Sequence, residues 1–378
     1  MNDETFEVLE RRLQKDGPDA GFKFLLQRFR EEKKYPSIFE ARLMKKRLEL
    51  GLSLIQDGTP SDLSPEKEEA YHKASLDAAR EVGELFLQDG EIELAWPYFR
   101  AIGELAPVAS AIEKVDSNGD IDRIVEIAFY EAANPSKGFE LILSKYGICR
   151  AITSYGHYPK AEGREESARL LIRILYRELA GNLKRTIRER EGQAPETDSI
   201  SDLIAGRDWL FEGNRYYIDT SHVTSVMQIG RDLEDRETLE MILDLSEYGR
   251  RLAPIFQYKG EPPFEDIFQD HRIYLRALLG QDAEAAIAHF RAKLAPPDGE
   301  GLPDPAAQAL VKLLVRLERY SEAIGVSAEY LANADPEQLN CPSTLQLCQL
   351  AGDFKQLGSQ ARRKDDLLSY IAALLQTG

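Results

Sequence analysis

Histidine is scarce in this chain of 378 residues, with five in all. Three of them lie in short segments that combine aromatic and polar residues near predicted helix ends: Tyr146–Tyr158, Tyr216–His222 and Tyr258–His271. Neutral imidazole is a good ligand for zinc or iron, and a nearby carboxylate can add an oxygen ligand. The candidate ligands of such a divalent metal ion are His157, Asp219, His222 and His271. Since histidine titrates near neutral pH, the same residues would also suit general acid–base catalysis.

Each of these histidines also has a structural interpretation. Thr220 or Ser221 can cap a helix, which would leave His222 in its first turn. His157 follows Gly156 in a predicted turn. The chain contains no HExxH, paired CxxC or His-x-His motif, so the spacing matches no known metal signature.

Aromatic residues of the same three segments are candidates for the wall of a ligand pocket: Tyr155, Tyr158, Tyr217 and Phe264. Aromatic rings line many ligand cavities, but they also fill the space between helices without any ligand. Both interpretations of these four residues remain open at the level of the sequence.

Motifs of several enzyme classes are missing from the chain. It has no Walker A loop, no GxGxxG dinucleotide fingerprint and no GxSxG nucleophile elbow, so ATP, NAD and serine-hydrolase chemistry are not indicated. The three cysteines are Cys149, Cys341 and Cys348. Their odd number and wide spacing fit packing roles in a reducing compartment such as the cytoplasm.

Charge and hydropathy narrow the range of partners. The chain has 65 Asp and Glu against 48 Lys and Arg, which gives a formal net charge of −17. Such a field repels nucleic-acid phosphates and anionic lipid headgroups. No segment approaches the ~18 consecutive apolar residues of a membrane span, and the acidic start Met1–Leu9 does not resemble a secretory signal. We therefore expect no nucleic acid, no membrane and a cytoplasmic location.

The elements that must position these residues are helices. Apolar residues recur at helical spacing almost throughout, for example Leu171, Leu175 and Leu179. One stretch, Trp209–Ile218, instead places a Gly-Asn turn between two aromatic-rich runs and predicts a small β-hairpin at 209–218. The predicted fold class is all-α with this single exception.

One stretch, at 83–107, carries the strongest repeat signal. Its small, aromatic, turn and terminating residues are Gly83, Phe86, Gly90, Ala95, Phe99 and Pro107. In these positions it resembles the tetratricopeptide repeat (TPR), a helical hairpin of about 34 residues. Looser copies follow around Ala285 and Ala323. The resemblance implies TPR-like antiparallel hairpins that stack into an α-solenoid, a superhelix whose concave groove binds a protein partner.

Loop-like composition marks three stretches: Asp57–Ser64, Gly192–Ser199 and Pro296–Pro305. We predict N-terminal helical hairpins over 1–117, an irregular central helical region over 118–260 and C-terminal TPR-like hairpins over 261–378. The predicted function is that of a cytoplasmic scaffold or adaptor for a protein partner, with a basic partner favoured by the net charge. The alternative is an enzyme, metal-dependent if the central histidines and Asp219 converge.

Overall fold

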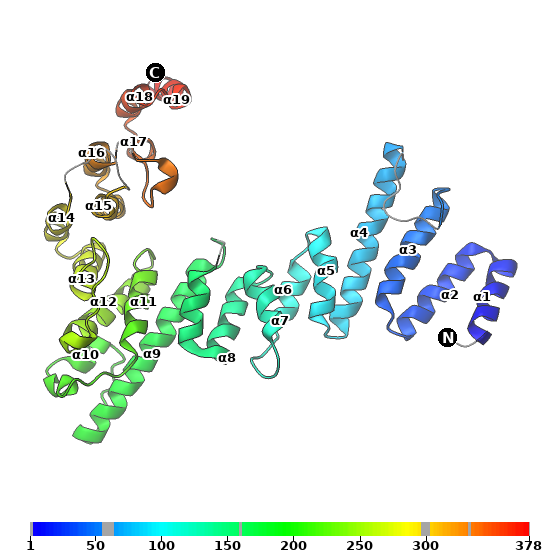
Figure 1. Cartoon of the computed structure of the whole chain (residues 1–378), viewed down its shortest axis with the longest axis horizontal. Coiled ribbons are helices and arrows are strands. Elements are labelled where there is room, and N and C mark those ends of the chain that lie inside the picture. The colour runs from blue at the N-terminus through cyan, green and yellow to red at the C-terminus, as the bar shows by residue number, and fades with distance from the viewer. Residues whose placement is uncertain (1–2, 55–63, 159–160, 296–302, 332–333, 378) are drawn as a thin grey trace. The chain divides into compact units, whose positions relative to one another are not determined.

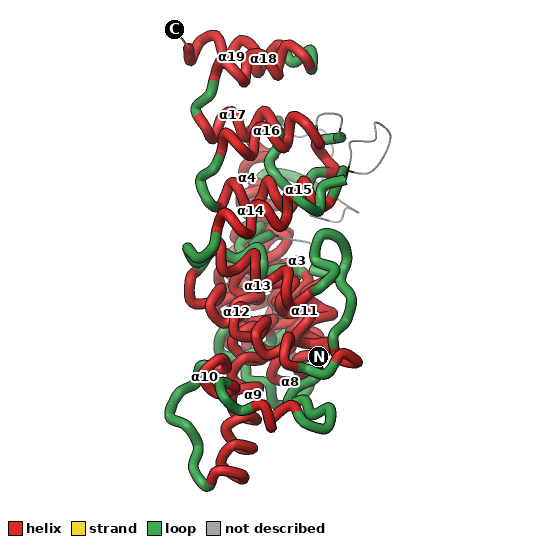
Figure 2. Tube along the Cα trace, turned by 90° about the vertical axis from the view of Figure 1, so that its left-hand side faces the viewer, coloured by secondary structure: helices red, strands yellow, loops and turns green. Residues whose placement is uncertain are grey.

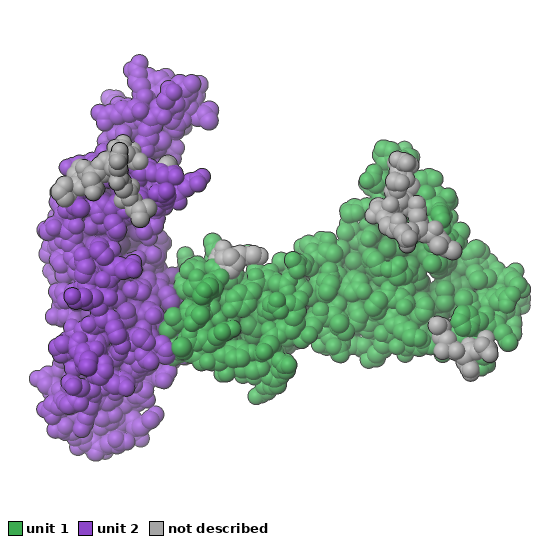
Figure 3. Space-filling view, viewed as in Figure 1, with its two compact units in different colours: residues 1–167 green, residues 168–378 purple. Residues whose placement is uncertain are grey.

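Two compact units make up the chain, unit 1 over residues 1–167 and unit 2 over residues 168–378 (Figure 3). The computed structural model describes residues 3–54, 64–158, 161–295, 303–331 and 334–377. The boundary between the units falls in the first turn of helix α9 (Arg164–Glu191). The three-part division at 117 and 260 stays a prediction.

Both units are built from α-helices, which confirms the all-α prediction. Figure 2 shows helices joined by loops, and the described residues form no β-strand. The predicted loop Gly192–Ser199 is irregular, as expected. Most of the other two predicted loops, residues 57–63 and 296–302, lies outside the described residues. No helix in the described part of the chain is both long and apolar enough to cross a membrane.

The helices of unit 1 follow one another along the chain (Figure 1). They are α1 (Asp3–Asp16), α2 (Pro18–Glu31), α3 (Tyr35–Glu49), α4 (Pro65–Gln88), α5 (Ile92–Ile102), α6 (Ala106–Ile112), α7 (Asp122–Val125) with the π-helical turn η1 (Glu126–Tyr130), and α8 (Pro135–Gly156). Each of α1 to α5 packs on the next helix along the chain. The core of this unit therefore lies in a series of helix–helix contacts.

The stretch at 83–107 shows how one such contact is built. Gly83 of α4 lies against the ring of Phe99 on α5, so close that a Cβ at residue 83 would be 2.6 Å from Phe99 Cε2. Gly90 turns the chain between the two helices with a positive φ of 83°, a conformation that favours glycine. Ala95 and Phe99 are fully buried. Small residues thus bring α4 and α5 together, as the sequence predicts.

Unit 2 is also built from helices, which range from 5 residues in α10 to 28 in α9. They are α9, α10 (Ile200–Ile204), α11 (Thr220–Gly230), α12 (Arg236–Arg251), α13 (Ile267–Leu278), α14 (Ala283–Arg291), α15 (Pro305–Arg316), α16 (Tyr320–Tyr330), α17 (Thr344–Ala351), α18 (Phe354–Arg363) and α19 (Leu367–Thr377), with 3₁₀ turns η2 (Asp208–Phe211), η3 (Pro254–Phe256) and η4 (Pro336–Gln338). From α11 to α19, each helix packs on its neighbour along the chain. Buried aliphatic and aromatic side chains fill these contacts.

The prediction of a β-hairpin at 209–218 is wrong, but the predicted turn at its centre is present. Gly213 and Asn214 both have a positive φ, as a tight hairpin turn requires. The residues before the turn form η2 instead of a strand. The backbone N–H of Tyr217 donates to the hydroxyl of Tyr248 (2.9 Å), and the Tyr217 hydroxyl donates to the carbonyl of Leu210 (2.8 Å). Side chains thus take the hydrogen bonds that a second strand would have made.

Candidate functional sites

The four predicted metal ligands occupy ordinary structural positions. His157 is exposed at the C-cap of α8, and its Nδ1 lies 2.8 Å from the carbonyl of Thr153. Asp219 is the N-cap of α11, where its carboxylate accepts hydrogen bonds from the N–H and the hydroxyl of Ser221. His222 lies in the first turn of that helix. His271 is fully buried on α13.

These positions do not support the predicted metal site. Within each unit, the described residues include no group of three or more His, Cys, Asp or Glu side chains that could hold a metal ion. The physical reason is local: the Asp219 carboxylate satisfies a helix N-terminus, and His157 and His271 each direct Nδ1 at a carbonyl of their own helix.

The four predicted pocket aromatics divide between core and cavity. Tyr155 and Tyr158 are buried in unit 1, where Tyr158 stacks on Phe129 with ring centroids 4.4 Å apart. Tyr217 is half-buried in unit 2, where its hydroxyl donates to the carbonyl of Leu210. Phe264 lines a pocket of unit 2 together with His271, and their ring centroids lie 4.4 Å apart. The structure thus brings together one predicted aromatic and one predicted histidine.

Unit 1 contains an open apolar groove of about 430 Å³ between α2, α3 and α5. We call it the unit 1 groove; its lining residues are Phe22, Leu25, Phe29, Pro36, Ser37, Phe39, Glu40, Ala41, Met44 and Tyr98. Phe39 and Tyr98 meet edge to face, with ring centroids 5.9 Å apart. Met44 is 40% exposed, and Glu40 is the only acidic or basic residue among the described residues of the lining. The groove therefore presents aromatic and thioether surface that the core of the unit does not cover.

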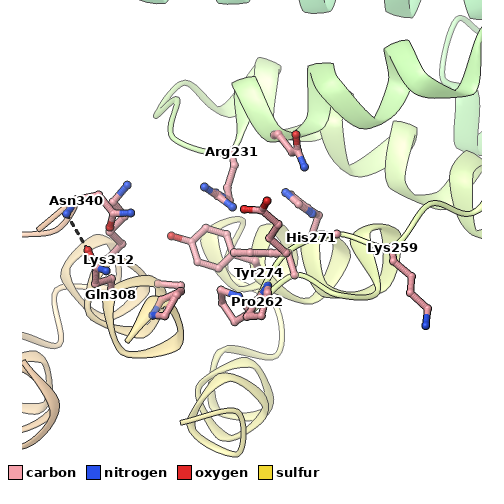
Figure 4. A pocket seen from close by; sticks show the side chains of 15 residues that line it. Arg231, Lys259, Pro262, His271, Tyr274, Gln308, Lys312 and Asn340 are labelled. Carbon is pink, nitrogen blue, oxygen red and sulfur yellow. Dashed lines mark hydrogen bonds between the residues drawn. The ribbon is translucent and has the colours of Figure 1, made fainter. Parts of the chain in front are cut away.

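Unit 2 contains a polar pocket of about 710 Å³. We call it the unit 2 pocket. Figure 4 shows Arg231, His271 and Tyr274 gathered on one side of it and Gln308, Lys312 and Asn340 on the other. Arg231 comes from the end of α11, His271 and Tyr274 from α13, and Lys312 from α15. The loop before α13 closes the wall with Lys259–Phe264.

Buried hydrogen bonds hold these walls in place. Gln308 is 5% exposed; its amide donates to the carbonyl of Pro303 (3.1 Å) and accepts from the N–H of Asn340 (2.8 Å). Arg316 donates to the carbonyls of Arg231 (2.8 Å) and Leu233 (2.5 Å). The segments that carry Arg231 and Asn340 are thereby tied to α15.

A buried carboxylate anchors the loop before α13. Asp270 is 2% exposed and lies 2.7 Å from Nε2 of His289 and 2.8 Å from Nζ of Lys293. Lys293 also donates to the carbonyl of Pro263 (2.5 Å) and to Glu265 (2.7 Å). These groups satisfy one another, so we interpret them as the support of the pocket wall and not as a second site.

The electrostatics of the unit 2 pocket differ from those of the whole chain. Among the described lining residues, three carry a positive charge, Arg231, Lys259 and Lys312, against one carboxylate, that of Glu261. Asp232 lies beside the pocket, 3.3 Å from Lys312 Nζ and 3.9 Å from Arg231 Nε. Burial raises the pKa of Tyr274 to about 12, so its hydroxyl stays protonated at neutral pH. The lining is thus cationic in a chain of net charge −17.

Most residues of the unit 2 pocket have no recognisable motif in the sequence. Arg231, Lys312 and Asn340 are separated by long stretches of chain and meet only because α11, α13 and α15 pack together. The one local signal is the proline-rich loop Lys259–Phe264, with the consecutive residues Pro262 and Pro263. That loop could have been recognised as a rigid wall before α13, but not as a partner of Arg231.

Comparison with known proteins finds no family model, no curated protein and no solved structure that matches the chain. The unit 1 groove and the unit 2 pocket are therefore the features from which function can be inferred.

Proposed function

We propose that this chain is a cytoplasmic helical-repeat adaptor of the TPR-like type that binds a protein partner. Within each unit, helices pack chiefly on their neighbours along the chain, which is the arrangement that stacked helical hairpins require. All three cysteines are free, as expected for a reducing compartment. Both observations support a solenoid of degenerate hairpins in the cytoplasm.

The observation that carries the proposal is the unit 1 groove. Aromatic residues and methionine are enriched where proteins contact each other, because they contribute large area at low entropic cost. Phe29, Phe39 and Tyr98 are only partly buried in the groove, and Met44 is 40% exposed beside them. Flexible methionine surface adapts to side chains of different shape. We infer that the groove receives apolar side chains of a protein partner.

An amphipathic helix is the partner element that fits this groove best. Helices that dock in apolar grooves insert side chains from positions i, i+3 or i+4, and i+7. The unit 1 groove lies between α2, α3 and α5, so it offers helical surface on more than one side. Glu40 at its edge favours a basic residue beside the apolar anchors, in line with the net charge of the chain.

Selection from a displayed library of random peptides tests this function on the full chain. Peptides enriched on the wild-type protein are measured against Met44→Asp, which places a charge in the groove, and against Leu94→Asp. Leu94 is 51% exposed on α5 and does not line the groove, so it is the matched control. We expect Met44→Asp to weaken binding at least about tenfold and Leu94→Asp to leave it unchanged.

Two results would contradict the proposal. One is the absence of any enriched peptide on the wild-type protein. The other is a set of peptides that bind both variants as tightly as the wild type. Those peptides would be using another surface, such as the exposed apolar face of α19, which carries Leu367, Leu368 and Leu375. Circular dichroism of each variant establishes that it is folded.

A further inference from the structure

The unit 2 pocket plays no part in the proposed adaptor function, because its lining lies entirely within residues 228–340 and the groove lies in unit 1. Its chemistry also differs: the groove is apolar, whereas the pocket is lined by cations, amides, a tyrosine and a histidine. The kind of ligand that the unit 2 pocket binds must therefore be inferred from the residues of the pocket itself.

Arg231 is the best-positioned cation in the pocket. Its guanidinium lies over the ring of buried Phe264, 4.5 Å from the centroid, and its backbone carbonyl is held by Arg316. Such stacking fixes the planar group without using its N–H donors. The nearest carboxylate, that of Asp232, is 3.9 Å away and is shared with Lys312. Arg231 and Lys312 can therefore receive an oxyanion with little rearrangement.

His271 supplies the second recognition element. Its Nδ1 lies 2.6 Å from the carbonyl of Ile267, and a carbonyl can only accept, so Nδ1 carries the proton. Nε2 is then an acceptor. It is buried in the pocket wall and has no hydrogen-bond partner among the described residues. A buried acceptor without a donor is costly, so a ligand that offers an O–H or N–H here gains affinity.

We propose that the unit 2 pocket binds a small organic oxyanion, a carboxylate or a phosphate, that carries a hydroxyl group beside the anionic end. The oxyanion lies between Arg231 and Lys312, and the hydroxyl donates to Nε2 of His271. The volume of about 710 Å³ is within the range of small-molecule sites. An inorganic anion without an O–H, such as sulfate or chloride, would satisfy the cations but leave His271 without a donor.

Two matched pairs of probes test this proposal by calorimetry on the full chain. Malate and succinate differ only in one hydroxyl, and so do 2-hydroxypropyl phosphate and propyl phosphate. We expect the hydroxylated member of at least one pair to bind about tenfold more tightly, the effect of one hydrogen bond to a buried acceptor. The pair that binds identifies the anion as carboxylate or phosphate.

Variants assign the two recognition elements. Arg231→Gln should abolish binding of both members of the pair, and His271→Phe should remove the preference for the hydroxyl while retaining weak binding. Arg236→Gln makes the same charge change at a side chain that is 71% exposed outside the pocket, and it should bind as the wild type does. Lys312→Gln tests the same anion position as Arg231→Gln. If His271→Phe does not fold, the difference in affinity within each pair of probes on the wild type still tests the hydroxyl position.

Three outcomes would overturn the proposal. They are failure of all four probes to bind the wild type at millimolar concentration, equal affinity within the pair that binds, and unchanged binding by Arg231→Gln. None of these results bears on peptide binding in unit 1, so failure of this site and failure of the adaptor function are separately visible.

Discussion

The two ring nitrogens of His271 meet different surroundings, and this fixes the charge of the residue. Burial and, to a lesser extent, the nearby positive charge of Arg231 together lower the pKa of His271 to about 4, against the opposite effects of the hydrogen bond to Ile267 and of the charges of Asp270 and Asp232. Imidazole in an unfolded chain titrates near a pH of about 6.5. His271 is therefore neutral in the folded protein at physiological pH and presents a lone pair at Nε2.

This difference makes unit 2 less stable in mild acid. Between the two pKa values the unfolded chain takes up a proton at residue 271 and the folded chain does not, so stability falls as the pH drops. The contribution of His271 amounts to about 2 kcal/mol between pH 7 and pH 5. Urea unfolding at both pH values measures it, and His271→Phe should show a correspondingly smaller loss.

His72→Gln is the control for this pH effect. His72 is exposed on α4 in unit 1, so His72→Gln removes an imidazole without changing the surroundings of His271. Equal pH dependence in the wild type and His271→Phe would show that the buried imidazole does not resist protonation.

At the residue scale, the sequence identified His271 and Phe264 but not their roles. Scarce histidines in aromatic segments suggested metal ligands, whereas the orientation of Nδ1 toward Ile267 makes His271 a buried acceptor. That orientation depends on helix geometry and on burial against Phe264, neither of which is visible in spacing. The role of Arg231 could not be predicted from the sequence, because the residues that line the pocket with it belong to other helices.

Helices follow from the sequence more directly, because the period of about 3.6 residues in the apolar pattern reports which face is buried. The same reasoning fails at Trp209–Ile218, where aromatic residues suggested strands. Leu210 is instead fully buried in the 3₁₀ turn η2, and the hydroxyl of Tyr248 accepts a hydrogen bond from the N–H of Tyr217. A short aromatic run does not determine its own hydrogen-bond partners; α12, which carries Tyr248, does so here.

The contact between α4 and α5 depends on the absence of a side chain at residue 83. We expect Gly83→Ala to lower the free energy of unfolding by about 2 kcal/mol, since its methyl group would overlap the ring of Phe99 and force the helices apart. Gly181→Ala is the matched substitution in α9. Apart from the backbone of its own helix, its Cβ would have no described atom within 4 Å, so the better helix propensity of alanine should raise stability by about 1 kcal/mol.

Opposite signs for the two glycine substitutions are therefore expected in urea unfolding. Stabilisation by Gly83→Ala would mean that α4 and α5 are not packed through a glycine contact. It would also remove the physical basis for the TPR-like interpretation of the stretch at 83–107. Destabilisation by both would point to a general intolerance of alanine at helical glycines.

Over the whole molecule, the division at residue 167 has no signal in composition or charge. It falls inside helix α9, whereas the predicted boundaries lie at residues 117 and 260. A compact unit is defined by contacts between helices. A boundary between two units can therefore fall within one helix whose backbone hydrogen bonds continue across it. The class of the fold could therefore be predicted from the sequence, whereas a unit boundary inside a helix leaves no signal in composition.

The packing of helices on their neighbours along the chain gives a final prediction about which helices a core substitution destabilises. Val82 on α4 and Leu314 on α15 are both fully buried, and truncation of either to alanine costs about 2 kcal/mol or more. Because α4 packs on α3, α5 and α6, Val82→Ala should speed amide hydrogen exchange in those helices and leave α13–α16 at wild-type rates. Leu314→Ala should do the reverse, chiefly in α13, α14 and α16. Mass spectrometry of exchanged peptides resolves the two patterns, and faster exchange throughout both units in either variant would contradict a stack stabilised by neighbouring helices.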